Sequence, residues 1–109
     1  MIGGLILGDG GFSTVILRGI GPSLVSAGIT NALADPVIEL HNGNGDLIDT
    51  NDNWMDDPNM QVISEAGLAP TDPNEAALYE ILPAGAYTAI LSGAGGTSGV
   101  GLVESYNTD

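Results

Sequence analysis

Oxygen-bearing side chains are concentrated between residues 46 and 57, and such a group suits Ca²⁺, which takes about six to eight oxygen ligands. The candidate ligands are Asp46, Asp49, Asn51, Asp52 and Asp56. The spacing begins like the calcium loop of an EF-hand, but Trp54 stands where that loop needs glycine and Met60 where it needs glutamate. Asp and Asn side chains also bond to their own backbone in solvated loops. Two interpretations therefore remain open: a calcium site that is not an EF-hand, and a plain polar loop.

Two ring-bearing side chains each have a binding interpretation and a structural one. Trp54, the only tryptophan, has the shape to stack on a sugar ring and is a candidate ligand-binding residue. A lone tryptophan in a polar loop more often folds back over the open end of a core, and we favour this interpretation. His41 stands beside the Asn42-Gly43 turn, with no second His and no Cys to share a zinc ion, so we expect an exposed turn residue.

The composition argues against catalysis. The 109 residues include one Arg, one His, no Lys and no Cys, against fourteen Asp and Glu, and the formal net charge is -13. Most catalytic constellations place a cation, a thiol or an imidazole beside a carboxylate. Only Arg18 and His41 can supply one here, so we predict that the chain is not an enzyme. Arg18 is instead expected to pair with a carboxylate, and the candidates are Asp35, Glu39 and Glu104.

The same charge limits the partners. Phosphate contacts need Lys and Arg, so we expect no nucleic-acid partner, and an anionic membrane surface is disfavoured for the same reason. No apolar run approaches the ~20 residues that span a bilayer, so we expect no membrane insertion. The only cofactor that the residues suggest is Ca²⁺.

Short apolar blocks between turn signals predict an all-β fold. The blocks with the pattern of strands are residues 4–7, 13–20, 37–41, 46–49, 76–82, 86–91 and 99–106. About seven short strands with frequent turns are typical of an antiparallel β-sandwich with Ig-like or Greek-key-like connections. One short helical segment is expected near residues 58–66, ended by Gly67. We expect residues 1–109 to form a single domain.

Alternation within the blocks predicts the core and the exposed edge. The predicted core residues are Leu5, Leu7, Val15, Leu17, Ile38, Leu40, Leu78, Tyr87, Ala89, Leu91, Val100 and Leu102. The first strand carries no charge, and the chain has no Lys to protect a sheet edge, so we expect this strand to pair with another copy or repeat. The candidate interface residues are Gly4, Leu5, Ile6, Leu7, Tyr79 and Ile81.

Six blocks follow one another along the chain: IGGLIL, RGIGPSL, ALADP, NDNW, PAGAYTA and GLVESY. In these blocks and their order the chain resembles a repeat module of bacterial secreted and cell-surface proteins, which often occurs in tandem within very long chains. The resemblance covers nearly all 109 residues and implies a location and an architecture without an activity. The resembling repeats carry a polar, glycine-containing lead-in that is absent here. We therefore expect either a repeat cut out of a longer chain or a short relative that obtains the missing strand differently.

Two functions from different classes follow from this reasoning. The first is a structural building block of an extracellular fibre or surface stalk, which assembles with copies of itself or with neighbouring repeats by strand addition or tandem packing. The alternative is a calcium-dependent or glycan-binding accessory module of a secreted protein. Both functions place the protein outside the cell or on the cell surface.

Overall fold

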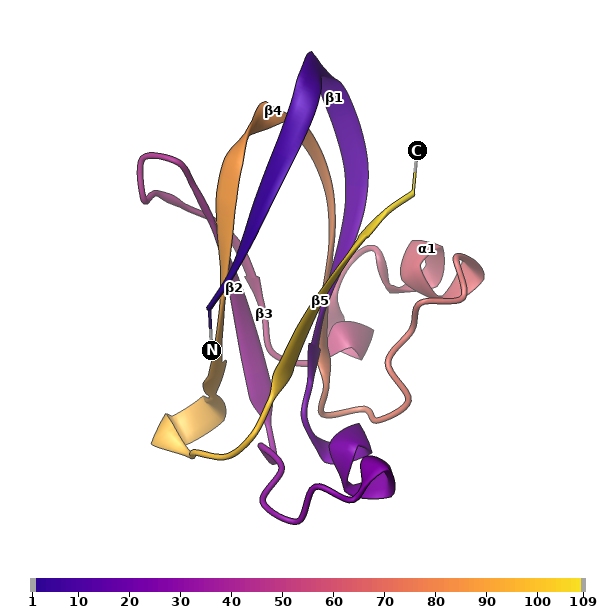
Figure 1. Ribbon diagram of the computed structural model, residues 1–109. Helices are drawn as coiled ribbons and strands as arrows, with labels where there is room; N and C mark the ends of the chain where they lie inside the picture. Colours follow the sequence, from indigo (N-terminus) through magenta and orange to yellow (C-terminus); the bar gives the residue numbers. More distant parts are fainter. Residues whose placement is uncertain (1, 109) are drawn as a thin grey trace.

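The computed structural model describes residues 2–108, and for Asp9 it describes the backbone alone. Within these residues the strands form an antiparallel five-stranded sheet in the order β3-β2-β4-β1-β5 (Figure 1). The strands are β1 (Ile2–Ile20), β2 (Pro36–Asn42), β3 (Leu47–Asn51), β4 (Ala76–Gly93) and β5 (Leu102–Asn107). The helices are the 3-10 turns η1 (Pro22–Ala27), η2 (Trp54–Asp56) and η3 (Ala94–Gly96), and α1 (Met60–Glu65). The all-β class is confirmed.

Two long strands replace four of the predicted short ones. Residues 4–7 and 13–20 both belong to β1, which pairs with β4 from Ile2 opposite Ile90 to Gly19 opposite Ala76. The glycine-rich segment 8–11 is therefore a bend with a register shift and not the turn that its composition predicts. A hairpin there would set the two blocks of β1 against each other, whereas each block pairs with its own half of β4. The described residues consequently form five strands and not seven.

The main core lies between the two halves of the bent sheet. Residues from the first half of β1, from β2 and from the end of β4 pack against residues from the second half of β1 and the start of β4. The buried members are Leu7, Val15, Leu17, Leu33, Ile38, Leu40, Ala76, Leu78, Leu82, Tyr87, Ala89 and Leu91. Leu5 and Val103 pack against them from partly buried positions.

Two predicted core residues, Val100 and Leu102, are wrong, since each remains 39% exposed. The core-facing residue of β5 is Val103, which lies opposite Gly19 of β1. Gly101 is buried, and a Cβ at this position would lie 2.5 Å from Leu91 Cδ2. The close approach at Gly101 and the pairing with β1 together place Val103 on the inner face, and a shift of one residue exchanges the two faces of a strand.

A second, smaller cluster lies on the outer face of β1 and β4. Ile16 and Ala77 contribute to it from the sheet, and the polar-looking segment between β3 and β4 covers them with Ile63 of α1. The partly buried members are Trp54, Leu68, Ala69 and Tyr79. The predicted helix near residues 58–66 is confirmed as Met60–Glu65, and Gly67 follows it at a φ of 75°, where glycine is favoured.

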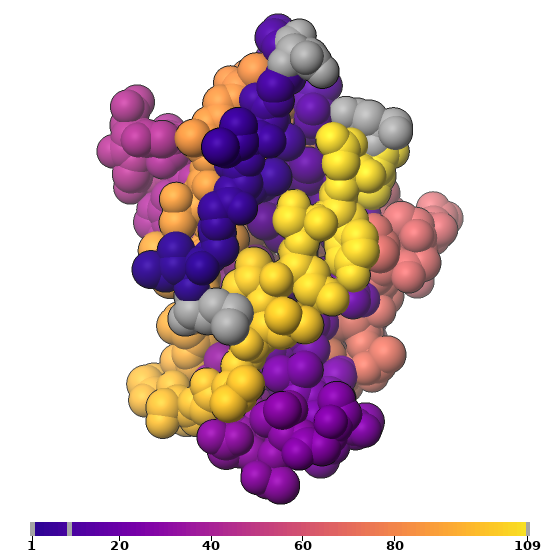
Figure 2. Space-filling view, viewed as in Figure 1, coloured from indigo at the N-terminus to yellow at the C-terminus, as the bar shows by residue number. Residues whose placement is uncertain are grey.

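The first half of β1 lies beside β5 on one face of the molecule, as Figure 2 shows. A Cβ at Gly3 would contact Val103 Cγ1 at 3.5 Å, although β5 forms its backbone pairs with the second half of β1, from Val15 to Ile20. Residues 4–7 pair with β4 of the same chain, and Leu7 is buried there. Among the described residues we find no helix with the length and apolar character that a membrane crossing requires.

Candidate functional site

The predicted calcium ligands have different neighbours in the structure. Asp46 and Asp56 are exposed, at the hairpin after β2 and in η2, whereas Asn51 is buried and bonds to the Ala77 N–H and the Asn53 carbonyl at 3.0 and 3.1 Å. Asp49 and Asp52 each lie beside an acid from a different part of the chain. Among the side chains that the structure describes, no group of three or more His, Asp or Glu residues is placed to hold a metal ion.

Asp49 of β3 forms a carboxyl pair with Glu80 of β4. Partial burial raises the pKa of Glu80 to about 8, and the hydrogen bond to Asp49 and the charges of Asp49 and Asp57 act in the same direction. Glu80 therefore holds a proton at neutral pH and can donate it to Asp49. Glu80 alternates with Leu78 and Leu82 on the inner face of β4, so the pair links the strands along this side of the core.

A second carboxyl pair consists of Asp52 and Asp35. Desolvation raises the pKa of Asp52, and the hydrogen bond and charge of Asp35 and the charge of Asp56 raise it further. One Asp35 carboxylate oxygen is buried without a hydrogen-bond partner. The Glu80–Asp49 pair shows how the fold accommodates like charges without a cation, because a shared proton replaces an ion pair.

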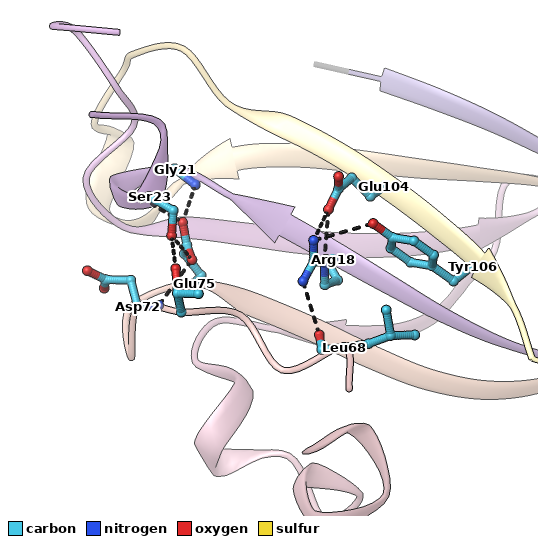
Figure 3. A network of polar contacts seen from close by, with 9 residues as sticks. Arg18, Gly21, Ser23, Leu68, Asp72, Glu75, Glu104 and Tyr106 are labelled. Atoms are coloured by element: carbon cyan, nitrogen blue, oxygen red, sulfur yellow. Dashed lines mark hydrogen bonds and ion pairs between the residues drawn. The ribbon is translucent and has the colours of Figure 1, made fainter. Parts of the chain in front are cut away.

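Arg18, the single arginine, pairs with a carboxylate as predicted, and its partner is Glu104. Arg18 Nε and Nη2 donate to Glu104 Oε1 at 2.9 and 2.5 Å (Figure 3). Nη1 donates to the Leu68 carbonyl at 3.3 Å, and the guanidinium carbon lies 5.3 Å from the centre of the Tyr106 ring. The guanidinium is thus engaged by β5 and by the segment after α1, which leaves it little capacity to clamp a substrate anion.

Sequence reasoning missed Glu75, the most deeply buried acid. Its carboxylate accepts bonds from the N–H groups of Gly21 and Ser23 at 3.0 and 2.9 Å and from Ser23 Oγ at 2.6 Å (Figure 3). The Asp72 N–H donates to it at 3.2 Å. Glu75 thereby fixes the start of η1 to the start of β4. Its main partners lie more than 50 residues away in the sequence, so no local signal distinguishes it from the other acids.

Trp54 is half-buried and packs in the second cluster, not over the open end of the main core. Its indole N–H is buried without a hydrogen-bond partner. Most of the ring is consequently occupied by contacts with its own chain.

His41 is half-buried and is therefore not the exposed turn residue that the sequence predicts. Its Nε2 lies 3.1 Å from Glu39 Oε1 and its Nδ1 3.2 Å from the Gly45 carbonyl. The Glu39 bond, followed by the Gly45 bond, raises the pKa of His41 against a smaller opposing effect of desolvation. A shallow groove of about 530 Å³ runs beside it. The groove is lined by His41, Asn42, Gly43, Gly45, Ala86, Thr88 and Ile90, which include no carboxylate or thiol.

Exposed apolar side chains occur at both ends of the long dimension of the molecule, which measures 42 × 30 × 23 Å. At the bend of β1 and β4, Ile6, Phe12 and Ile81 are 83%, 71% and 59% exposed; we call these residues the bend end. Beside η1, Val25, Val100 and Leu102 are 61%, 39% and 39% exposed; we call these residues the η1 end. Figure 1 shows the bend at the top and η1 at the bottom.

The fold and these surfaces were compared with known proteins. No protein-family model, curated protein or solved structure matches the chain. A functional interpretation therefore depends on the surfaces and side chains of the chain itself.

Long stretches of the sequence carry no charge. Residues 10–17, 19–34 and 81–103 contain no charged side chain, and these stretches supply most of the bend and of the region around η1. Leu47 and Ile48 are exposed between Asp46 and Asp49, whereas Ile2, which is 71% exposed, lies in a stretch without acids.

Proposed function

We propose that this protein is a structural building block of an extracellular fibre or surface stalk, and that it packs against copies of itself or against neighbouring repeats. The observation that carries the proposal is the set of large apolar side chains that an elongated molecule leaves exposed, among them Ile6, Phe12 and Val25. Apolar residues exposed in this way are common at protein–protein contacts. The extracellular location is supported by the sequence resemblance alone.

In this role the bent sheet acts as a sandwich, and its two halves form the two layers. Seven strand segments result when each half of β1 and of β4 is counted separately, which is the arrangement that the sequence favours. The contacts of Arg18 and His41, the two side chains that could assist catalysis, support a non-enzymatic role. Arg18 is occupied by Glu104, and His41 by Glu39. Neither is directed at a nucleophile in the described contacts.

Packing of whole ends has more support than exchange of the first strand. Residues 4–7 already pair with β4, so exchange would first have to break those backbone bonds and expose Leu7. The alternative function, binding of calcium or a glycan, has less support because the described side chains include no group of three or more acids or His placed to hold a metal ion, and because Trp54 packs into the second cluster.

Sedimentation velocity and electron microscopy of the purified chain test the proposal. Screening of the acidic sides should strengthen self-association as salt rises from about 0.02 M to about 0.5 M, since the Debye length then falls well below ~10 Å. We expect oligomers or fibres that grow with concentration and salt. A chain that stays monomeric at millimolar concentration across this range refutes a self-assembling building block.

A further inference from the structure

We propose that the peptide bond between Asp35 and Pro36 is a site of self-cleavage, at which the Asp35 side chain cuts its own backbone. The chain contains three Asp–Pro bonds, at positions 35–36, 57–58 and 72–73. Asp–Pro bonds are labile in mild acid because the tertiary amide nitrogen of proline accepts a proton readily and leaves as a secondary amine. The structure sets the first of the three apart from the other two. This inference goes beyond the proposed function and does not depend on it.

The cleavage needs only the residue itself, a proton and water. The Asp35 carboxylate attacks the carbonyl carbon of the same residue, and the new C–O bond closes a five-membered cyclic anhydride. The C–N bond to Pro36 breaks, its electron pair stays on the nitrogen, and the nitrogen takes a proton from solvent. Water then hydrolyses the anhydride, so the net reaction consumes one water and leaves a free carboxylate at Asp35 and a free amine at Pro36.

The Asp35 carboxylate has an oxygen that is available for this attack. Its Oδ1 is buried and has no hydrogen-bond partner among the residues that the structure describes. The hydrogen bond that Asp35 shares with Asp52 leaves this oxygen unoccupied. An oxygen that has lost water without gaining another donor is less stable than a solvated one. It therefore has less stabilisation to lose when it attacks the backbone.

The other two sites lack this available oxygen. Asp57 Oδ1 accepts a hydrogen bond from the Asn59 N–H at 2.8 Å, and Asp72 Oδ1 accepts one from the Asn74 N–H at 2.9 Å. Each bond reaches two residues along the chain, as is usual for an Asp that stabilises its own turn. The bond fixes the side chain and engages an oxygen that would have to attack.

The backbone carbonyls are similar at the three sites, so the carboxylate decides their order of reactivity. A backbone N–H donates to the carbonyl oxygen in every case: Ala94 to Asp35 at 2.8 Å, Met60 to Asp57 at 3.0 Å, and Glu75 to Asp72 at 3.1 Å. Such a donor stabilises the negative charge that forms on the carbonyl oxygen during the attack. The carbonyl is thus prepared at all three bonds, and the free carboxylate oxygen is particular to Asp35.

Cleavage at this bond leaves the molecule assembled. β1 precedes the cut and pairs with β4 and β5, which follow it. The two pieces, residues 1–35 and 36–109, are therefore held together by the sheet and separate only when the protein is denatured.

Incubation of the purified chain at about pH 5 for several days, followed by mass spectrometry under denaturing conditions, measures all three bonds together; at this pH most Asp side chains remain ionised. In the folded chain we expect cleavage after Asp35 to be at least ~tenfold faster than after Asp57 or Asp72. In about 6 M guanidinium chloride, which removes the structural difference, the three rates should lie within ~threefold of one another. Asp35→Asn, checked for folding by circular dichroism, should lose cleavage at 35–36 and keep the other two rates.

The unfolded chain is the reference for every outcome. A folded chain that stays intact at 35–36 while the unfolded chain is cut there shows that the fold protects this bond. Equal rates at the three sites of the folded chain show that the free Oδ1 gives no advantage, and cleavage of Asp35→Asn at 35–36 assigns the reaction to another nucleophile. Each of these results overturns self-cleavage by Asp35, and none of them affects the building-block function.

Discussion

The carboxyl pair of Glu80 and Asp49 makes the stability of this protein depend on pH in an unusual direction. The folded-state pKa of Glu80 is about 8, against an ordinary value of 4.5, because the site is partly desolvated and Asp49 and Asp57 are close. Between these two values the folded chain binds one more proton than the unfolded chain. The free energy of unfolding therefore falls as pH rises toward the folded pKa, and the stabilising contribution is complete only below the unfolded pKa.

The size of the effect follows from the two pKa values. With one extra proton bound, the free energy of unfolding decreases by about 1.4 kcal/mol per pH unit, so the full loss between pH 6 and pH 9 is about 2.5 kcal/mol. Because Glu80 is only partly buried, solvent screening reduces the expected loss of unfolding free energy to roughly 1–1.5 kcal/mol. Glu80→Gln removes the titrating group while keeping a hydrogen-bond donor for Asp49. The variant should match the intact chain near pH 6 and exceed it by about 1 kcal/mol near pH 9, or ~5 °C in melting temperature.

Urea denaturation at several pH values between about 6 and about 9 measures this difference directly. Glu65→Gln is the matched control, because Glu65 is an exposed acid on α1. Asp49→Asn should also flatten the pH dependence, since it removes the carboxylate that shares the proton. If the curves of Glu80→Gln and the intact chain run parallel over the whole range, Glu80 is already ionised at pH 6 and the reasoning is wrong.

Three further predictions concern stability and metal binding. Glu75→Gln places an amide N–H against the donors that the carboxylate now satisfies and should lower the free energy of unfolding by about 2–4 kcal/mol in urea titrations; an effect below about 0.5 kcal/mol would contradict the buried network. Gly21→Ala sets a Cβ 2.1 Å from the Leu33 carbonyl oxygen and should cost more than about 2 kcal/mol, whereas Gly4→Ala, with nothing within 4 Å, should stay within about 0.5 kcal/mol. Because no group of three or more acids or His among the described side chains is placed to hold a metal ion, about 2 mM Ca²⁺ should shift the melting temperature by no more than Mg²⁺ at equal ionic strength, and a calcium-specific rise would favour the alternative function.

Local features of the fold could be predicted from the sequence because they depend on neighbouring residues. Apolar blocks between turn signals located the strand segments, since alternation along a strand and the glycine and proline breaks are properties of adjacent positions. The short helix before Gly67 is of the same kind, because the glycine adopts a positive φ that ends a helix. The pairing of Arg18 with an acid also followed from composition, since the chain offers one strong cation and many carboxylates.

The acids between residues 46 and 57 show why the neighbours of side chains were harder to predict than the positions of strands. A dense run of acids between residues 46 and 57 is visible in the sequence, but the strand geometry of β3 and the turn of η2 direct its members to different neighbours. Asp49 meets Glu80 and Asp52 meets Asp35, each pair formed by residues distant in the sequence. Asp52 and Asp56 remain close enough for the charge of Asp56 to raise the pKa of Asp52, but the acid beside Asp49 comes from β4 and could not be identified from the local sequence.

The acidic character of this protein and the places where its strand segments form can be derived from adjacent residues. Three other features depend on long-range pairing: residues 8–11 bend one strand instead of joining two, Val103 and not Leu102 faces the core, and Glu75 is buried. Each of these depends on which distant strand pairs with which, and in what register. The exposure of Phe12, at 71%, has the same origin, because the position of the rest of the chain decides which side chains are covered.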